Sequence, residues 1–488
     1  MKKIVVVFSL LTSLFSYGQT SVSWENVYGQ NGSECGYHVL SCLDQGYIVA
    51  GSTSSGGISD GYLVRVDSLG LVMWQKYYTG NNVDIFRSIK QLPDSGYIIA
   101  GYSNSAGTHG GYDGWVMRTD KNGDSLWSKM IGTSNWDFFY DVAPTYDGGF
   151  VLCGGTYGQG AGDEDMWFVK INGNGDTLWT KTQGGVKQDE ARGIIETGDS
   201  LLATCGFTYS LADTLGDSWI LRMNANGDTL WTGTAGYDST ADNSWGLCDN
   251  YSTGRIFFCG DLKTPAGDKD PYFGAYFYNG TNQFMYSSGG SGDEIFYGIK
   301  MNSVGTIAAI GVNYTIGLGN GDFFLFETKT VWASHAFGTP LIDVGYSLDF
   351  THDNGYITCG YTNGYNSNSP NVYLVKLDSN ASNTGVLAIR EPPSNLTGFG
   401  VTIFPNPVQQ SATVIVDATQ KIDHEMEMNI FDISGRKVEI ISPNEWEFTQ
   451  LNSAKYSLQT DQFENGVYFY VISNKDGIMS SGKFIVAH

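Results

Sequence analysis

The strongest constraint on the fold is a short apolar strand ending in glycine, which recurs seven times along the 488-residue chain. It reads GYIVAG in the first copy, GYIIAG in the second and GFVLCG in the third. Neighbouring copies are 49 to 54 residues apart, a regular spacing that indicates repeated structural units. The closing glycines are Gly51, Gly101, Gly154, Gly206, Gly260, Gly311 and Gly360.

Each repeat also contains one strand before this segment and two after it. The third strand reads GWVMRTD, MWFVKIN or SWILRMN, and it leads through an Asn-Gly turn into a fourth strand such as SLWSK or TLWTK. Asn-Gly between apolar runs favours a hairpin, because both residues tolerate a positive φ. Four antiparallel strands repeated seven times predict an all-β fold, a seven-bladed β-propeller over residues 19–380.

The last repeat lacks a fourth strand of its own. A matching strand, SWENVYG, precedes the first repeat and carries Trp24. We therefore expect this N-terminal strand to complete the last sheet and close the ring, which would remove an open sheet edge. The corresponding positions of the seven fourth strands are Trp24, Trp74, Trp127, Trp179, Trp231, Met285 and Trp332.

The N-terminus predicts an export signal. Lys2 and Lys3 precede an apolar run that is too short to span a bilayer, and the small residues Ser16 and Gly18 follow it. Residues 1–18 are expected to be a signal peptide, with the mature chain starting at Gln19. The protein is therefore predicted to be secreted or held at the outer cell surface.

The composition of the chain limits the classes of molecule that it can bind. The formal net charge is −23, so the surface repels nucleic acid. Glycine is abundant, with 64 residues, and aromatic residues make up 14% of the chain, which suits many short strands joined by tight turns. Four of the seven cysteines directly precede a closing glycine and are expected to be small core residues: Cys153, Cys205, Cys259 and Cys359.

After Asp378 the repeat stops, and residues 381–400 form a polar, proline-containing stretch that we interpret as a linker. Residues 401–488 contain strands of a different pattern, such as ATVIVDA and NGVYFYVIS. Four short motifs occur among them in order: Pro405, Asn406 and Pro407; Asp432 and Gly435; Gly466 and Tyr468; and Gly482 and Lys483.

These motifs resemble the type A C-terminal sorting domain of type IX secretion cargo from Bacteroidota. The resemblance implies a small β-sandwich that is recognised by the type IX secretion machinery. It also implies removal of this domain at the cell surface, followed by release or by attachment to lipopolysaccharide. The residues alone, without the resemblance, predict only a compact all-β appendage.

No catalytic residue can be assigned from the sequence. The six histidines are scattered without an HExxH motif, and no GxSxG elbow or Walker loop occurs. No cofactor is expected. The Asn-Gly-Asp turns resemble calcium loops only in part, because the longer acidic ladder of such a loop is missing.

One group of polar residues does repeat: an acidic residue begins the first strand of every unit. The seven acids are Glu34, Asp84, Asp137, Asp189, Asp242, Glu294 and Asp343. Three residues later come Tyr37, Arg87, Tyr140, Arg192, Trp245, Tyr297 and Tyr346. A second acid, such as Asp113 or Asp165, opens the third strand of six units.

Two interpretations of these acids are open. Each acid could cap a turn by accepting backbone N–H bonds. Alternatively, the acids could form an acidic mouth, rimmed by aromatic residues such as Tyr140 and Trp245, that binds a glycan or a cation such as Ca²⁺. The second interpretation makes the seven acids, Tyr140 and Trp245 the candidate ligand-binding residues.

The regular repeats and the missing catalytic cluster favour a non-enzymatic surface or secreted binding protein, adhesive in character, with a glycan or protein ligand. The alternative is an extracellular hydrolase or lyase acting on polysaccharide or peptide, since propellers host many chemistries. A purely structural module is the third hypothesis. An enzyme should break the repeat with unmatched carboxylates in the central mouth, and the sequence shows no clear break of that kind.

Overall fold

The computed structural model describes residues 22–29, 32–105, 107, 109–211, 215–236, 240–317, 319–329, 332–364, 369–381, 399–404, 408–418, 425–432, 436–450, 452–474 and 477–486. The predicted signal peptide lies outside these residues, as do Pro405, Asn406, Pro407 and Gly435. Within the described ranges, no helix has the length and apolar character needed to cross a membrane.

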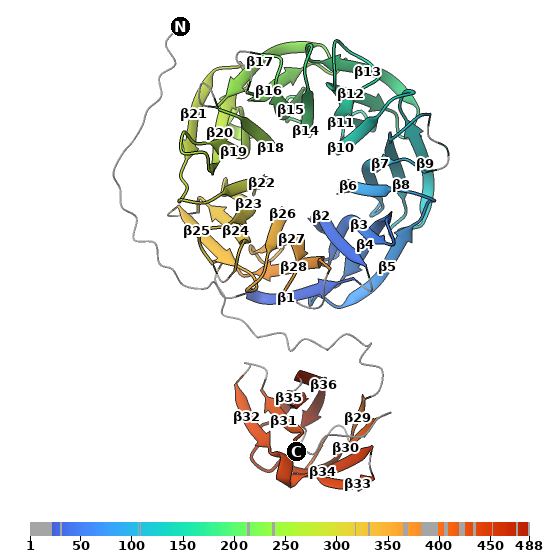
Figure 1. The fold of residues 1–488 in the computed structure, drawn as a ribbon, viewed down its shortest axis with the longest axis vertical. Coiled ribbons are helices and arrows are strands. Elements are labelled where there is room, and N and C mark those ends of the chain that lie inside the picture. The colour runs from blue at the N-terminus through green and yellow to red at the C-terminus, as the bar shows by residue number, and fades with distance from the viewer. Residues whose placement is uncertain are drawn as a thin grey trace.

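Residues 22–377 form seven four-stranded antiparallel sheets, which lie side by side around a ring in Figure 1. The all-β, repeated-sheet expectation is thus confirmed, and the arrangement is propeller-like. From the innermost strand outward, the first two sheets contain β2 (Ser33–Ser41), β3 (Tyr47–Ser55), β4 (Ile58–Val66) and β5 (Val72–Tyr78), and β6 (Asp84–Gln91), β7 (Tyr97–Ser103), β8 (Asp113–Thr119) and β9 (Ser125–Ile131). In the same order, the next three sheets contain β10 (Asp137–Pro144), β11 (Phe150–Thr156), β12 (Asp165–Ile171) and β13 (Thr177–Gln183); β14 (Asp189–Glu196), β15 (Leu202–Thr208), β16 (Asp217–Met223) and β17 (Thr229–Ala235); and β18 (Asp242–Asn250), β19 (Arg255–Lys263), β20 (Lys269–Phe277) and β21 (Asn282–Ser287). The last two sheets contain β22 (Glu294–Met301), β23 (Ile307–Asn313), β24 (Asp322–Glu327) and β25 (Ala333–Phe337), and β26 (Asp343–Phe350), β27 (Tyr356–Thr362), β28 (Asn371–Leu377) and β1 (Val22–Tyr28). A short 3₁₀ helix, η1 (Tyr251–Thr253), lies between β18 and β19.

The N-terminal strand pairs as the sequence predicted. β1 runs antiparallel to β28, with Glu25 opposite Val375 and Val27 opposite Tyr373. The first and last segments of the ring therefore share one sheet.

The core lies between neighbouring sheets. In β11 and β12 every residue is buried, because each strand is covered on both faces, while the fourth strand β13 is exposed or half-buried. Seven main clusters of buried residues each join two adjacent sheets around the ring. One joins Ile310 of β23 to Val375 of β28, and the next joins Val372 of β28 to Val49 of β3. The four cysteines of the repeated strand are buried in these clusters, as expected.

At the outer rim, the tryptophan of one fourth strand lies against the turn glycine of the next sheet. Gly175 has a φ of +82°, and a Cβ built on it would come within 2.9 Å of the Trp127 ring. Glycine is needed there both for the left-handed backbone and for the close approach of the ring. The pairs are Trp24–Gly70, Trp74–Gly123, Trp127–Gly175, Trp179–Gly227 and Trp231–Gly280.

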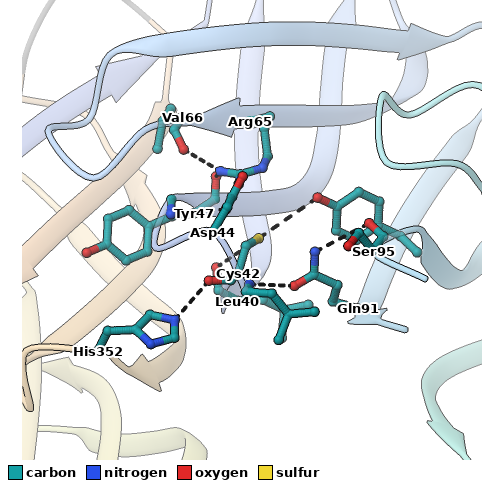
Figure 2. Close-up of polar contacts among 12 residues, drawn as sticks. Leu40, Cys42, Asp44, Tyr47, Arg65, Val66, Gln91, Ser95 and His352 are labelled. Carbon is teal, nitrogen blue, oxygen red and sulfur yellow. Dashed lines mark hydrogen bonds and ion pairs between the residues drawn. The ribbon is translucent and has the colours of Figure 1, made fainter. Parts of the chain in front are cut away.

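In five of the seven sheets, a cation from the third strand binds the turn that follows the first strand. Figure 2 shows Arg65 reaching the carbonyl oxygens of Tyr47, at 3.0 Å, and of Val66, and pairing with Asp44. The same ion pair occurs in four more sheets: Arg118–Asp94, Lys170–Asp147, Arg222–Asp199 and Lys376–Asp353.

Neighbouring sheets also contact this turn from both sides. His352, from the turn between β26 and β27, places its Nε2 2.9 Å from the Cys42 carbonyl oxygen (Figure 2). Gln91 of β6 accepts a hydrogen bond from the backbone N–H of Leu43 at 2.9 Å. The first sheet is therefore linked to both the second and the last.

Residues 399–486 form two further four-stranded sheets that share one core, with Trp446, Tyr468 and Phe484 among its buried residues. The strands, in spatial order, are β29 (Phe399–Phe404), β30 (Ser411–Ala418), β34 (Ser453–Gln459) and β33 (Glu447–Gln450), and β32 (Lys437–Ile441), β31 (Glu427–Phe431), β35 (Gly466–Asn474) and β36 (Gly477–Val486). A 3₁₀ helix, η2 (Pro443–Glu445), follows β32.

The sorting motif residues that the structure describes occupy defined places in these two sheets. Asp432 accepts a hydrogen bond from the Arg436 N–H at 3.1 Å, which fits the turn predicted there. Gly466 opens β35, and the buried Tyr468 donates to the Glu464 carbonyl at 2.9 Å. Gly482 and Lys483 lie in β36, opposite Tyr470 and Phe469.

Candidate functional site

The inner wall of the ring carries the same irregularity in every sheet. In each of the seven innermost strands the pairing register shifts around the third residue after the opening acid, which leaves that residue as the extra residue of a β-bulge. A bulge bends its strand and redirects one side chain. The seven bulge residues are Tyr37, Arg87, Tyr140, Arg192, Trp245, Tyr297 and Tyr346.

These seven side chains contact one another in sequence around the circle, and we call them the collar. Both arginines are stacked between aromatic rings, a favourable cation–π arrangement. From ring centroid to guanidinium carbon, or between centroids, the distances are Tyr37–Arg87 4.2 Å, Arg87–Tyr140 5.7 Å, Tyr140–Arg192 4.1 Å, Arg192–Trp245 4.9 Å, Trp245–Tyr297 5.8 Å, Tyr297–Tyr346 5.0 Å and Tyr346–Tyr37 5.5 Å.

A cavity of about 200 Å³ opens at the collar. It is lined by the collar and by residues that follow it on the innermost strands, including His38, Lys90, Asp141 and Lys300. The Lys90 ammonium lies 3.0 Å from an Asp141 carboxylate oxygen and 3.5 Å from Nε2 of His38. Burial, together with the charges of Lys90 and Lys300, holds the pKa of His38 well below its usual value.

The seven opening acids lie elsewhere. All seven are buried, at 0–3% exposure, and of the nine candidate ligand-binding residues only Tyr140 and Trp245 line the cavity. Their carboxylates accept hydrogen bonds from nearby strand and loop residues: Glu34 from Thr53 Oγ1 (3.2 Å), Asp84 from Ser105 Oγ (2.7 Å), Asp137 from Thr133 N (2.5 Å), Asp189 from Gly185 N (2.7 Å), Asp242 from Lys263 N (3.0 Å), Glu294 from Gly290 N (2.8 Å) and Asp343 from Thr339 Oγ1 (2.8 Å). Five of the seven acids accept a backbone N–H bond, as the capping interpretation requires, while the bonds shown for Glu34 and Asp84 come from hydroxyl groups. Ligand binding by these acids stays a prediction.

The two acidic columns meet between neighbouring sheets. A Cβ built on Gly132 would lie 1.8 Å from Asp113 Oδ1 and 3.0 Å from Asp137 Oδ2, so both carboxylates flank this glycine. Burial raises the pKa of Asp113, and the nearby charge of Asp137 adds to the effect. In the part of the chain that the structure describes, no group of three or more His, Cys, Asp or Glu could hold a metal ion.

The repeat is broken beside Arg192 by two carboxylates, Glu164 and Glu190. Glu190 pairs with the Arg192 guanidinium at 2.6 Å, and Glu164 accepts a hydrogen bond from Gln188 Nε2 at 2.9 Å. Burial, and then the charge of Glu190, raises the pKa of Glu164 to about 7. Burial also raises the pKa of Glu190, against the opposing effect of Arg192.

Sequence reasoning missed this pair, although a comparison of the repeats contains the signal. In the six other units no acid stands at the position of Glu190 or at that of Glu164. The residues equivalent to Glu190 are Cys35, Ile85, Phe138, Asn243, Ile295 and Val344, and those equivalent to Glu164 are Ser59, Tyr112, Gly216, Lys269, Gly321 and Pro370.

Trp245 is also held by charged groups. Its indole N–H donates to the buried Asp261 at 2.5 Å, and Asp261 pairs with Lys269 at 3.0 Å. Together with Tyr297 and Tyr346, Trp245 also packs against a small apolar cluster that contains Ile295 and Val344.

Comparison with known proteins identifies one part of the chain. Residues 402–487 match the secretion system C-terminal sorting domain, which indicates export by type IX secretion. Two solved structures of Sqt1 from Chaetomium thermophilum are similar at 12% identity, one covering 82% of this chain and 96% of that chain with a TM-score of 0.43, the other 70% and 82% with 0.41. A glucose dehydrogenase structure covers 59% of this chain and 96% of that chain, at 12% identity and a TM-score of 0.34. No curated protein sequence matches the chain. The function of the ring therefore has to be inferred from its own residues.

Proposed function

We propose that this type IX cargo is a surface or secreted binding protein whose residues 22–377 form a closed seven-bladed β-propeller. The ligand, a glycan or a protein, binds at the collar. After export the sorting domain is removed, and the ring is either released or attached to surface lipopolysaccharide. Closure is supported by the pairing of β1 with β28 and by the contact circuit of the collar.

The binding role is supported mainly by the place at which the side chains depart from the repeat. At the rim the same tryptophan and glycine recur, whereas at the inner wall the bulge recurs with different side chains. Packing alone does not require an arginine at these positions, and charges removed from water are unfavourable unless they are paired. Side chains that depart from the repeat around a cavity are typical of a binding site on a rigid scaffold.

A glycan array probed with the full-length protein tests this proposal. Trp245→Ala removes the largest aromatic face of the collar and should weaken ligand binding at least tenfold. Tyr146→Ala is the matched control, because this tyrosine is 73% exposed in the turn between β10 and β11 and is not among the cavity-lining residues. Binding that W245A leaves unchanged would remove the collar from the proposal.

The second candidate function, an extracellular hydrolase or lyase acting on polysaccharide or peptide, is favoured by Glu164 and Glu190. Burial raises the pKa of both neighbouring carboxylates, that of Glu164 to about 7, and such a pair can supply a proton donor and a base. Tyr140 contributes a hydrogen bond to Glu190, and Arg192 neutralises charge beside it.

A release assay on crude polysaccharide separates this candidate from the first. If the ring is an enzyme, Glu164→Gln and Glu190→Gln should each lower product release by at least a hundredfold while leaving the array pattern intact. Product release by the wild type that neither variant changes would exclude these two carboxylates as the acid and base.

A further inference from the structure

The cavity at the collar is rich in positive charge, although the whole chain carries a formal charge of −23. Four cationic side chains line it: Arg87, Lys90, Arg192 and Lys300. A single carboxylate, Asp141, lines it as well, together with His38. A basic cavity in so acidic a protein is not expected from composition.

Two of the four cations are neutralised by carboxylates. Lys90 pairs with Asp141 at 3.0 Å, and Arg192 pairs with Glu190 at 2.6 Å. Asp141 is also engaged by the backbone N–H of Val142 at 2.9 Å, and through its second oxygen by that of Ile194 at 3.1 Å. Its capacity to neutralise further charge is therefore largely used.

The other two cations have no such partner. Among the described residues, neither the Arg87 guanidinium nor the Lys300 ammonium makes an ion pair or a side-chain hydrogen bond, and the guanidinium lies over the rings of Tyr37 and Tyr140. A cation with few polar partners in a recessed site is unfavourable. The pKa values of Lys90 and His38 are lowered by burial, and the charge of Lys300 contributes to both shifts.

We infer that the cavity is an anion-binding site, in which Arg87 and Lys300 bind the carboxylate or sulfate oxyanion of an acidic ligand. This deepens the proposed function, on which it rests, by naming the chemical class of the ligand. The guanidinium of Arg87 presents a planar set of donors suited to an oxyanion, and the Lys300 ammonium adds a second charge.

The dimensions of the cavity suit a small group. A sulfate or one acidic sugar unit is small enough for a cavity of about 200 Å³. The rings of Tyr37 and Tyr140 flank the Arg87 guanidinium and hold it beside the cavity. The oxyanion could belong to a free small acid or to one unit of an acidic glycan.

Titration calorimetry of the full-length protein with sulfate, glucuronate and glucose, at constant ionic strength, tests the inference. Glucuronate or sulfate should bind, and glucose, which lacks the carboxylate, should not. An oligomer of glucuronate distinguishes the two sources, since binding of the oligomer without the monomer assigns the oxyanion to a glycan. Binding of an acidic monomer and binding of the oligomer alone both support the inference.

Three variants locate the site. Lys300→Gln and Arg87→Gln should each weaken anion binding about tenfold or more. Lys121→Gln removes one positive charge from an exposed turn and should leave binding unchanged. Without ligand, K300Q should melt at or above the wild-type temperature, because it removes an unpaired charge beside Lys90. K300Q therefore remains a folded probe even if R87Q is unstable.

The outcomes that overturn the inference differ from those that overturn the proposed function. Wild-type protein that binds none of the acidic probes, or binding that neither K300Q nor R87Q weakens, rejects the anion site. If the glycan array still shows a neutral ligand that W245A abolishes, the binding function stands without it. Absence of any ligand in both assays rejects the two together.

Discussion

The outer rim and the inner wall of the ring use the same repeat differently. At the rim, five tryptophans of the fourth strands lie against five turn glycines of the next sheet. At the inner wall, seven bulges occupy equivalent places, but their residues are four tyrosines, two arginines and one tryptophan. The rim repeats side chains, and the inner wall repeats only backbone geometry.

This difference shows how a repeated scaffold can carry a non-repeated site. The rim contacts join one sheet to the next, so a substitution there disturbs the packing of two sheets. The collar side chains point to a shared central space, where the bulge fixes their position and the side chain itself can vary.

Deleting Val22 to Tyr28 should have the largest effect. The deletion removes β1, including the buried Trp24 and Tyr28, and exposes the unpaired edge of β28. Loss of a buried tryptophan alone costs about 3–5 kcal/mol. Thermal melts and light scattering should show a large loss of stability together with aggregation. A deletion variant that melts like the parent would mean that β1 does not hold the ring together.

Replacing a rim glycine should be the next most damaging change. Gly175→Ala meets both a left-handed backbone and the Trp127 ring, whereas Gly148→Ala has the same φ of +82° with no atom within 4 Å of the new Cβ. The backbone strain, about 1–2 kcal/mol, is common to both variants. Urea titration should therefore show the larger loss for G175A. Equal losses would show that the tryptophan contact adds nothing.

The buried acids between the sheets should behave as caps. Asp137→Ala leaves the Thr133 N–H without its acceptor and should lower the free energy of unfolding by about 1–3 kcal/mol. Asp137→Asn should lose less, because an amide oxygen still accepts the bond and one charge beside Asp113 is removed.

Calcium separates this account from the cation site that the sequence also allowed. Under capping, melts of the wild type in millimolar calcium and in chelator should coincide. A midpoint that rises with the logarithm of the calcium concentration would instead indicate a bound ion.

The last effect should come from Glu164, close to Arg192 of the collar, and it should depend on pH, being smallest below pH 4.5. The pKa of Glu164 in the folded protein is about 7, above the usual value of 4.5, so the folded state binds more protons between these values. Its contribution to stability is fully present below pH 4.5 and is lost as the pH rises through 7.

Glu164→Gln has no such loss, so its melting temperature relative to the wild type should rise between pH 4.5 and pH 8. Asp163→Asn, which removes an exposed carboxylate from the same loop, is the matched control. A melting difference for E164Q that stays constant with pH would argue against the raised pKa.

Local pattern made most of the scaffold predictable. The glycine-ending strands, the Asn-Gly turns and the tryptophan column are short-range signals, and each appears in the structure as a strand, a turn or a rim contact. The pairing of β1 with β28 was also predictable, because the last repeat has only three strands of its own and the N-terminal strand matches the missing fourth. The acidic columns were visible as well, but the sequence could not tell a buried cap from an exposed mouth.

By itself, then, the sequence determined the repeated four-stranded sheets, the partner of the N-terminal strand and the sorting domain. Each of these features depends on residues that are close together in the chain or that recur at a regular period. Only the tertiary structure decided what faces the central space. Lys90 and Lys300 are 210 positions apart in the chain, and they line one cavity because the sheets curve into a ring. Glu164 and Glu190 influence each other because a loop of one sheet lies against the first strand of the next. No local period encodes these contacts, which depend on the curvature of the whole ring and on the bulge in each innermost strand.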